Sequence, residues 1–470
     1  MSNKWGIKPE QAQVLMALEE LIGRQIPKLE DLSALWIGVK IEDDMVKTLS
    51  LYDCKLTFIP EEIGNLYSLQ KLFLIRNKLT NLPESLANLQ SLQFLDLSEN
   101  QFSVFPEPVT KLLSLQVLFM NDNQLVSLSN SIRQLKSLHA LFLRQNRLRS
   151  LPESIGNLKS LESLNLNHNE LKSIPNSLGN LTPLVELDLG SNQFTSLPDA
   201  ITTLTSLKKL LIEENLLTSL PNTLWKLKNL ETLFLWHNPW EGEWKEIADR
   251  DILTILDYCR QRASINVFLS HAVVDFEISH IKEISEYLQK QDEIYKVFYC
   301  EEDLAGNIDD FMDEKLPKCQ LVLFFASNKS IYNSEDCKHE LELARKHNIQ
   351  ILPIKGPDID WKELKELNLS RELGYEFEQE DFVAFCQKLY DYILKLKREI
   401  HLFEPEQAKI DRERVNFKTS VNNYIDSEGF KEQFEEVWDQ FAELFQDLSS
   451  GRINSVEYFS KCAQLLKENK

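Results

Sequence analysis

The chain has 470 residues, of which 52 are basic and 73 acidic, so its net charge is −21 and its isoelectric point lies near 5.0. This balance argues against nucleic acid held by a broad basic surface, because affinity for phosphate comes mainly from Lys and Arg. Hydrophobic residues make up 43 % and charged residues 27 % of the chain. These values are typical of folded protein, and the length is enough for about three domains.

The seven cysteines show no CxxC pair or other metal-ligand spacing, so we expect reduced thiols, no metal and no cofactor. Residues 1–13 lack the apolar stretch of a signal peptide. The longest clean apolar run, Leu321 to Ala326, is far too short to cross a bilayer. These observations predict a cytoplasmic protein without a membrane partner.

A period of 23 residues runs through the first half of the chain. It is clearest in one asparagine column: Asn77, Asn100, Asn123, Asn146, Asn169, Asn192, Asn215 and Asn238. Each unit reads LxxLxLxxNxL followed by xxLPxxLxxLxx, a pattern that resembles the leucine-rich repeat family and implies a solenoid. One unit cannot bury its leucines alone, but stacked units can. We therefore predict nine repeats over 48–238, counting one unit in which Cys54 replaces the asparagine.

An open stack of repeats needs a cover at each end. We predict an N-terminal cap over 1–47, with a helix from Glu10 to Ile22, and a C-terminal cap helix or linker over 239–262. Trp36 and Trp240 lie in these caps, and we interpret both as cap core.

Aromatic residues recur at strand positions that should face solvent on the concave side of the solenoid: Phe73, Phe119, Phe142, Phe234 and Trp236. They are candidates for recognising a ligand that the sequence does not identify. Equally well, neighbouring rings stack on one another and stabilise the sheet.

After residue 262 the repeat gives way to alternating strand and helix patterns. We expect strands at 265–269, 295–299, 321–325 and 349–354, and helices at 278–288, 308–316, 335–347 and 382–396. Such alternation at short spacing predicts an α/β domain over 263–400, with a parallel sheet covered on both faces. Functional groups in these folds gather at the carboxyl ends of the strands.

Three boxes in this region resemble those of Toll/interleukin-receptor (TIR) domains. They are Val267 to His271 with Asp275, Val297 to Ile308, and the SxxCxxEL pattern of Ser334 to Leu341. The resemblance implies a flavodoxin-like fold, self-association between TIR domains and, for members with SxxCxxEL, cleavage of NAD⁺ as substrate. The loop at 302–305 lacks the usual Arg and Pro, and Phe382-Val383 is the nearest counterpart of the third box.

In catalytic members of that family the glutamate of SxxCxxEL is essential, and here it is Glu340. Helical geometry places Glu340 in angle between Leu343 and Ala344 and close to Cys337, inside an apolar arc. A glutamate there costs desolvation unless it has a task or a partner. From the helix alone, the alternative is an ordinary glutamate at the edge of the apolar stripe.

We name five further candidates for lining the NAD⁺ pocket: Ser270, His271, Gly306, Ser334 and Cys337. Two of them have ordinary structural alternatives, since Gly306 can simply allow a turn and Ser334 can simply cap its helix.

The tail over 401–470 is predicted to be helical. Aromatic residues from Phe430 to Phe445 recur at spacings of three and four, with acidic residues between them. This amphipathic helix is expected to pack on the TIR domain or a neighbouring subunit, with recruitment of a partner as the alternative.

Taken together, the sequence predicts an immune-type sensor in which the repeats detect a ligand and the TIR domain self-associates and cleaves NAD⁺. No glycine is followed by lysine, so a phosphate loop between sensor and effector is absent. The alternative is a non-enzymatic adaptor that acts through TIR–TIR and repeat-mediated contacts. A scaffold of repeats alone does not explain the TIR boxes.

Overall fold

The computed structural model describes residues 3–30, 36–300, 308–369, 374–378, 381–402 and 461. The chain divides into two compact units, Met1–Ser264 and Ile265–Lys470, and each is described by itself. The predicted helical tail lies outside the described residues, apart from the end of one helix and residue 461.

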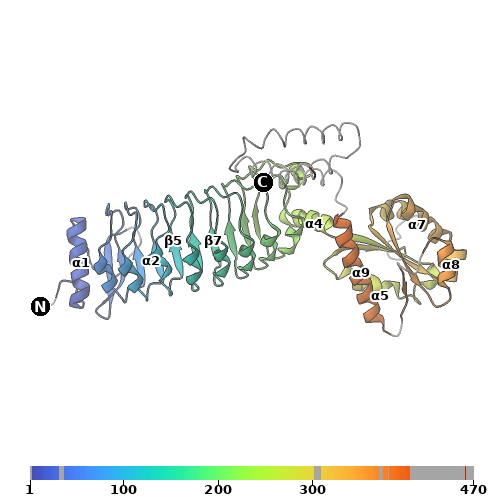
Figure 1. Ribbon diagram of the computed structural model, residues 1–470, viewed down its shortest axis with the longest axis horizontal. Helices are drawn as coiled ribbons and strands as arrows, with labels where there is room; N and C mark the ends of the chain where they lie inside the picture. Colours follow the sequence, from blue (N-terminus) through green and yellow to red (C-terminus); the bar gives the residue numbers. More distant parts are fainter. Residues whose placement is uncertain are drawn as a thin grey trace. The chain divides into compact units, whose positions relative to one another are not determined.

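The first unit is a solenoid built on one long sheet (Figure 1). Its strands follow chain order: β1 (Gly38–Glu42), β2 (Met45–Ser50), β3 (Lys71–Phe73), β4 (Phe94–Asp96), β5 (Val117–Phe119), β6 (Ala140–Phe142), β7 (Ser163–Asn165), β8 (Glu186–Asp188), β9 (Lys209–Leu211) and β10 (Thr232–Phe234). β1 pairs antiparallel with β2, and every later neighbour in this sheet is parallel.

A short helical segment follows each turn out of the sheet and packs on its neighbours in the stack. These segments are η1 (Glu61–Asn65), η2 (Glu84–Asn88), α2 (Glu107–Thr110), η3 (Asn130–Gln134), η4 (Glu153–Asn157), η5 (Asn176–Asn180), η6 (Asp199–Thr203) and η7 (Asn222–Lys226). A proline precedes most of them, because its fixed φ holds the chain extended before the turn. At the one exception, Ser129 instead accepts a hydrogen bond from the Ser131 amide at 3.1 Å.

The asparagine column joins successive repeats. In Asn169, Nδ2 donates to the carbonyls of Leu143, Leu166 and Asn167, and Oδ1 accepts from the amide of Leu148 at 3.0 Å. The residue before each asparagine has a positive φ, between 51° and 60°, as in His168 and Ser191. The leucines between these turns are almost completely buried and form one continuous core.

Caps close both ends of the solenoid. At the N-terminal end, α1 (Pro9–Ile22) packs near η1, and the buried Trp5 donates from Nε1 to the Ile26 carbonyl at 2.9 Å. The prediction for Trp36 was wrong: it is 68 % exposed, because Trp5 and α1 already fill the cap core. At the other end are α3 (Trp244–Ile247) and α4 (Ile252–Ala263), where Trp240 stacks on Trp244.

The second unit is a parallel sheet in the order β12-β11-β13-β14-β15. The strands are β11 (Ile265–Ser270), β12 (Ile294–Phe298), β13 (Leu321–Ala326), β14 (Gln350–Lys355) and β15 (Tyr375–Glu376). The described helical segments are η8 (Val273–Asp275), α5 (Ile281–Gln289), α6 (Ile308–Lys315), η9 (Leu316–Lys318), η10 (Lys329–Asn333), α7 (Glu335–Lys346), α8 (Trp361–Glu366) and α9 (Phe382–Leu402). The predicted doubly covered α/β sheet is confirmed.

Two apolar cores lie on opposite faces of this sheet, because alternate strand residues point to opposite sides. One core includes Leu269 and Phe325 and is covered by α5 and α9; the other includes Phe268 and Phe324 and is covered by α6, α7 and α8 (Figure 1). The expected helix from 278 was wrong at its start. His280 has φ +50°, which is not helical, so α5 begins only at Ile281. Ile278 therefore lies before the helix and is 62 % exposed.

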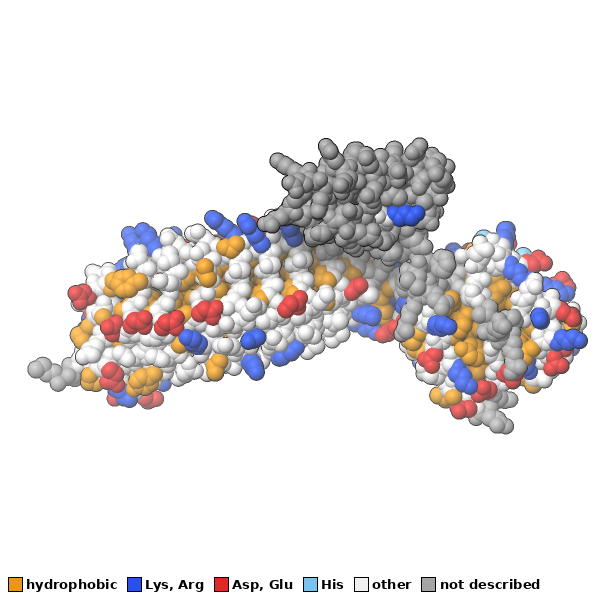
Figure 2. Space-filling view, viewed as in Figure 1, with side chains coloured by type: hydrophobic (Ala, Val, Ile, Leu, Met, Phe, Trp, Pro, Cys, Tyr) orange, Lys and Arg blue, Asp and Glu red, His pale blue; other side chains and the backbone are white. Residues whose placement is uncertain are grey.

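Charged side chains of both signs are interspersed on the face of the molecule shown in Figure 2. Among the described residues, no helix is long and apolar enough to cross a membrane.

Candidate functional site

Glu340 lies in the middle of α7 and is only 2 % exposed. It shares the buried side of the helix with Cys337, Leu343 and Ala344, which are also buried. The helix begins where Ser334 accepts a hydrogen bond from the Cys337 amide at 3.2 Å. Ser334 is therefore a helix cap that fixes where α7 starts, and with it the direction in which Glu340 points.

Both oxygens of the Glu340 carboxylate accept hydrogen bonds from the sheet. The Ser270 hydroxyl, at the end of β11, donates to Oε2. The Cys300 thiol, two residues after β12, donates to Oε1 across 3.6 Å. Three elements that are far apart in sequence thus meet at one carboxylate, at the carboxyl edge of the parallel sheet, where α/β folds place functional groups.

Cys337 is fully buried beside this carboxylate. Burial, reinforced by the negative charge of Glu340, raises the pKa of its thiol to about 12. A thiol with such a pKa stays protonated at neutral pH, so Cys337 is not a nucleophile here.

His271 directly follows Ser270, but its side chain lies on the opposite face of the sheet. Its Nδ1 lies 3.3 Å from the Leu269 carbonyl, and its ring packs against Phe276, which borders the core under α5 and α9. The structure therefore assigns Ser270 and His271, which we predicted as neighbours in one pocket, to different faces of the sheet. Gly306 lies outside the described residues.

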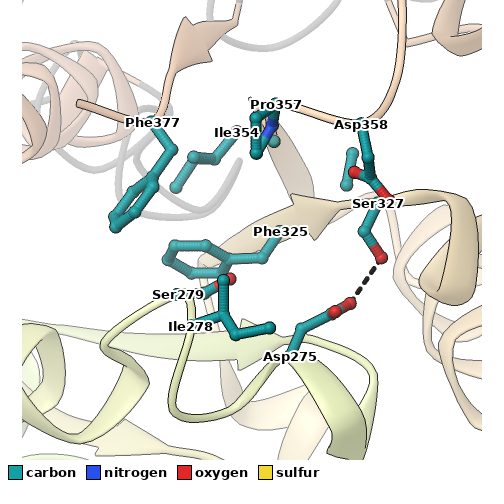
Figure 3. A pocket seen from close by; sticks show the side chains of 11 residues that line it. Asp275, Ile278, Ser279, Phe325, Ser327, Ile354, Pro357, Asp358 and Phe377 are labelled. Atoms are coloured by element: carbon teal, nitrogen blue, oxygen red, sulfur yellow. Dashed lines mark hydrogen bonds between the residues drawn. The ribbon is translucent and has the colours of Figure 1, made fainter. Parts of the chain in front are cut away.

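A cavity of about 200 Å³ opens at the same edge of the sheet (Figure 3). It lies on the face whose core includes Phe325 and Ile354, whereas the neighbours of Glu340 on α7 belong to the core on the other face. Its floor is apolar and includes Phe325, Ile354 and Phe377. At its rim, the Ser327 hydroxyl donates to Asp275, which ties the end of β13 to the segment after β11. Sequence reasoning missed this cavity; the only signal was the place of Asp275 in the first box.

Among the described residues, no group of three or more His, Cys, Asp or Glu side chains is arranged to hold a metal ion.

The solvent face of the solenoid sheet carries a continuous row of aromatic rings. Phe73, Phe94, Phe119 and Phe142 follow one another with centroids 5.0, 5.5 and 4.3 Å apart, and the last pair is stacked at 9°. Sequence reasoning missed Phe94, which stands two residues before the column that we followed. It covers Phe73, which is only 8 % exposed and so is not an exposed recognition residue.

Near the other end of the same face, Phe234 contacts Trp236 with centroids 4.1 Å apart, and Trp236 is 48 % exposed. Polar groups fill the space between the two aromatic groups: Asp188 accepts from the side chains of Asn165 and Asn167. Burial raises the pKa of Glu213, and the negative charges of Asp188 and Glu214 raise it further.

Two family models match the chain, one described as a leucine-rich repeat region, over residues 44–145 and 130–292, and one described as a TIR domain, over residues 267–389. The chain belongs to the leucine-rich-repeat family and carries a C-terminal TIR domain. The solenoid is therefore its repeat domain, and Glu340 lies in its TIR domain.

Two solved structures resemble parts of the chain. A leucine-rich-repeat protein of Leptospira interrogans is 36 % identical over 42 % of this chain and 56 % of its own, with a TM-score of 0.39. An internalin of Listeria monocytogenes is 21 % identical over 39 % of this chain and 66 % of its own, with a TM-score of 0.30. The chain thus spans less than two thirds of either protein, and no curated protein matches it.

Proposed function

We propose that this protein is a cytoplasmic immune-type sensor whose TIR domain cleaves NAD⁺ to nicotinamide and an ADP-ribose product. The presence of repeat and TIR domains supports a signalling role. The observation that carries the catalytic part is the buried carboxylate of Glu340 at the carboxyl edge of the sheet, within the SxxCxxEL pattern.

The chemistry suits a carboxylate. When the bond between ribose and nicotinamide breaks, its electron pair goes to the pyridine nitrogen, and nicotinamide leaves as a neutral molecule. Positive charge then develops on the ribose, and water adds to the anomeric carbon with loss of a proton. A nearby anion stabilises that charge and orients the ribose hydroxyls, as carboxylates do in glycoside hydrolysis.

The same residue implies that activity is conditional. A side chain that is 2 % exposed cannot touch a ribose, so its surroundings must rearrange before cleavage. The TIR resemblance supplies the condition, because neighbouring TIR domains complete the site in catalytic relatives. We therefore propose that self-association, promoted by a ligand on the repeat domain, makes Glu340 accessible.

The test measures nicotinamide release by the purified full chain, with and without a crowding agent that promotes assembly. Glu340→Ala is expected to abolish release. Glu342→Ala is the matched control, because Glu342 lies on the same helix but is exposed, and it should leave release unchanged. Activity that survives Glu340→Ala would remove Glu340 from the mechanism.

One observation favours a second candidate, the non-enzymatic adaptor. Both oxygens of Glu340 have donors, so this residue also resembles a structural glutamate that joins α7 to the sheet. An adaptor would form TIR assemblies, seen by light scattering, and yet release no nicotinamide from NAD⁺ in the assembled state.

A further inference from the structure

We propose that Ser270 is a positioning residue, which keeps the Glu340 carboxylate charged and correctly oriented for the reaction. This inference rests on the proposed function, since it concerns the same carboxylate. It changes the role predicted for Ser270 from lining the substrate pocket to acting through Glu340.

The first support is the cost of burying the carboxylate. Ser270 is completely buried, and Glu340 nearly so. A buried carboxyl group tends to take up a proton, because low dielectric disfavours its charged form, whereas a hydroxyl that donates to it favours that form. A protonated Glu340 could not stabilise a cationic ribose. The hydrogen bond from Ser270 therefore favours the charged form that the reaction needs.

The second support is rigidity. Ser270 ends β11, whose neighbours β12 and β13 hydrogen-bond to it on both sides, and Ser270 itself is in register with Phe324. Glu340 lies in the middle of α7, where its neighbours Cys337 and Ala344 are completely buried. The hydrogen bond therefore joins two well-packed elements, and it can persist while the groups that cover Glu340 move.

The third support is hydrogen-bonding capacity. A carboxylate offers about four lone-pair positions, and Ser270 and Cys300 use one on each oxygen. Each carboxylate oxygen can accept more than one hydrogen bond, so the bond from Ser270 does not prevent Glu340 from accepting one from a ribose hydroxyl. Cys300 is the weaker donor, because a thiol is a poor hydrogen-bond donor and its bond is long.

Other titratable groups around α7 do not replace this donor. The thiols of Cys300 and Cys337 face Glu340. On α6, Asp313 pairs with His339 at 3.3 Å, and on η9, Lys318 pairs with Glu314 at 3.1 Å. Ser270 therefore supplies the strongest neutral donor to the carboxylate among the contacts given above.

The experiment measures nicotinamide release from NAD⁺ by the assembled full chain between pH 5 and pH 9. Ser270→Ala is expected to lower kcat by up to roughly tenfold at the acidic end of this range and by less at neutral pH, with little change in KM, because a shift of about one pH unit changes the rate by at most about tenfold. Its acidic limb should move up by about one pH unit, so that activity approaches the wild-type value at high pH. Ser270→Thr keeps the hydroxyl and should restore most of the activity. Cys300→Ala should have a smaller effect.

A merely structural role for Ser270 would give a loss of the same size at every pH, and that result would overturn the inference. So would a kcat and pH profile equal to those of the wild type, or a gain of activity. Thermal unfolding of Ser270→Ala, monitored by circular dichroism, checks that the variant is folded at the assay temperature. An inactive wild-type chain refutes the proposed function itself, and the role of Ser270 with it, whereas an active wild type with a normal Ser270→Ala refutes only the role.

Discussion

The side-chain amide of Asn169 donates to the backbone carbonyl of Leu143, 26 residues earlier and in the preceding repeat, at 3.0 Å. The same amide bonds two carbonyls of its own turn, and its oxygen accepts from Leu148. One side chain thus bonds four backbone groups that belong to two successive repeats. This explains why the period of the sequence and the period of the structure coincide.

The first prediction concerns this asparagine. Asn169→Ala leaves the buried amide of Leu148 without this acceptor and removes one donor from each of three carbonyls, so it should lower the free energy of unfolding by about 2–4 kcal/mol. Urea unfolding followed by circular dichroism measures the change. Gln124→Ala, at an exposed position just after another asparagine of the column, is the control and should change stability by less than about 0.5 kcal/mol. Equal effects of the two substitutions would contradict the assigned role.

The second prediction concerns pH. Burial raises the pKa of Asp96, against the opposing effect of its bond from the Ser98 amide at 2.9 Å. The folded protein therefore binds this proton more tightly than the unfolded chain, and stability falls as pH rises from the unfolded pKa through the folded one. Asp96→Asn keeps the acceptor oxygen and removes the charge.

We expect Asp96→Asn to stabilise the repeat domain by about 1 kcal/mol at pH 7 and by much less near pH 3, where the native carboxyl is already protonated. Urea midpoints at the two pH values give the comparison, with exposed Glu162→Gln as the control. A stabilisation of the same size at both pH values would contradict the assignment to Asp96.

The third prediction separates the two aromatic groups of the repeat domain. Phe142 stacks on Phe119 and is half-buried, so Phe142→Ala should cost about 2 kcal/mol of stability through lost burial and stacking. Trp236 is 48 % exposed, and Trp236→Ala should cost less than about 1 kcal/mol. The opposite order in thermal unfolding would show that Trp236, not the Phe row, stabilises the sheet.

The fourth prediction concerns the cysteines. The described ones are buried, and burial raises the pKa values of Cys319 and Cys337 to about 12 and that of Cys386 to about 11. A buried, protonated thiol reacts slowly, so a thiol reagent at pH 8 should modify at most one of the seven cysteines quickly in the native protein and all seven in urea. Rapid native labelling of Cys337, located by mass spectrometry, would contradict its burial.

The solenoid could be predicted well from the sequence because every repeat places leucines and an asparagine at the same positions. A single Asn or Leu does not indicate a fold. A column of them at constant spacing predicts stacked repeats, because stacking buries all of these side chains together. Phe94 escaped prediction because it does not belong to the aromatic column: it lies at the other outward position of β4, from which its ring contacts Phe73 and Phe119 on the neighbouring strands.

The candidate site was only partly predictable. The buried angle of Glu340 followed from helical periodicity. Its partners did not, because Ser270 and Cys300 reach it from strand ends 70 and 40 residues away. Ser270 and His271 are adjacent in the first box, so both were predicted to line one pocket. Successive residues at the end of a strand point to opposite faces of the sheet, and this separates their side chains. Ile278 looked helical, but the left-handed backbone of His280 starts the helix three residues later.

The positive φ before each asparagine has a consequence for how this surface can change. Arg76, Asp122, His168 and Glu214 differ in size and charge, yet they share one backbone shape. Each of them precedes a buried asparagine, so side chains of different size and charge fit the same turn. Adjacent parallel strands lie about 4.8 Å apart. The side chains of these residues therefore form an evenly spaced row along one edge of the repeat domain. Exchanges among these residue types therefore change the charge of this edge while the backbone of the turn is kept.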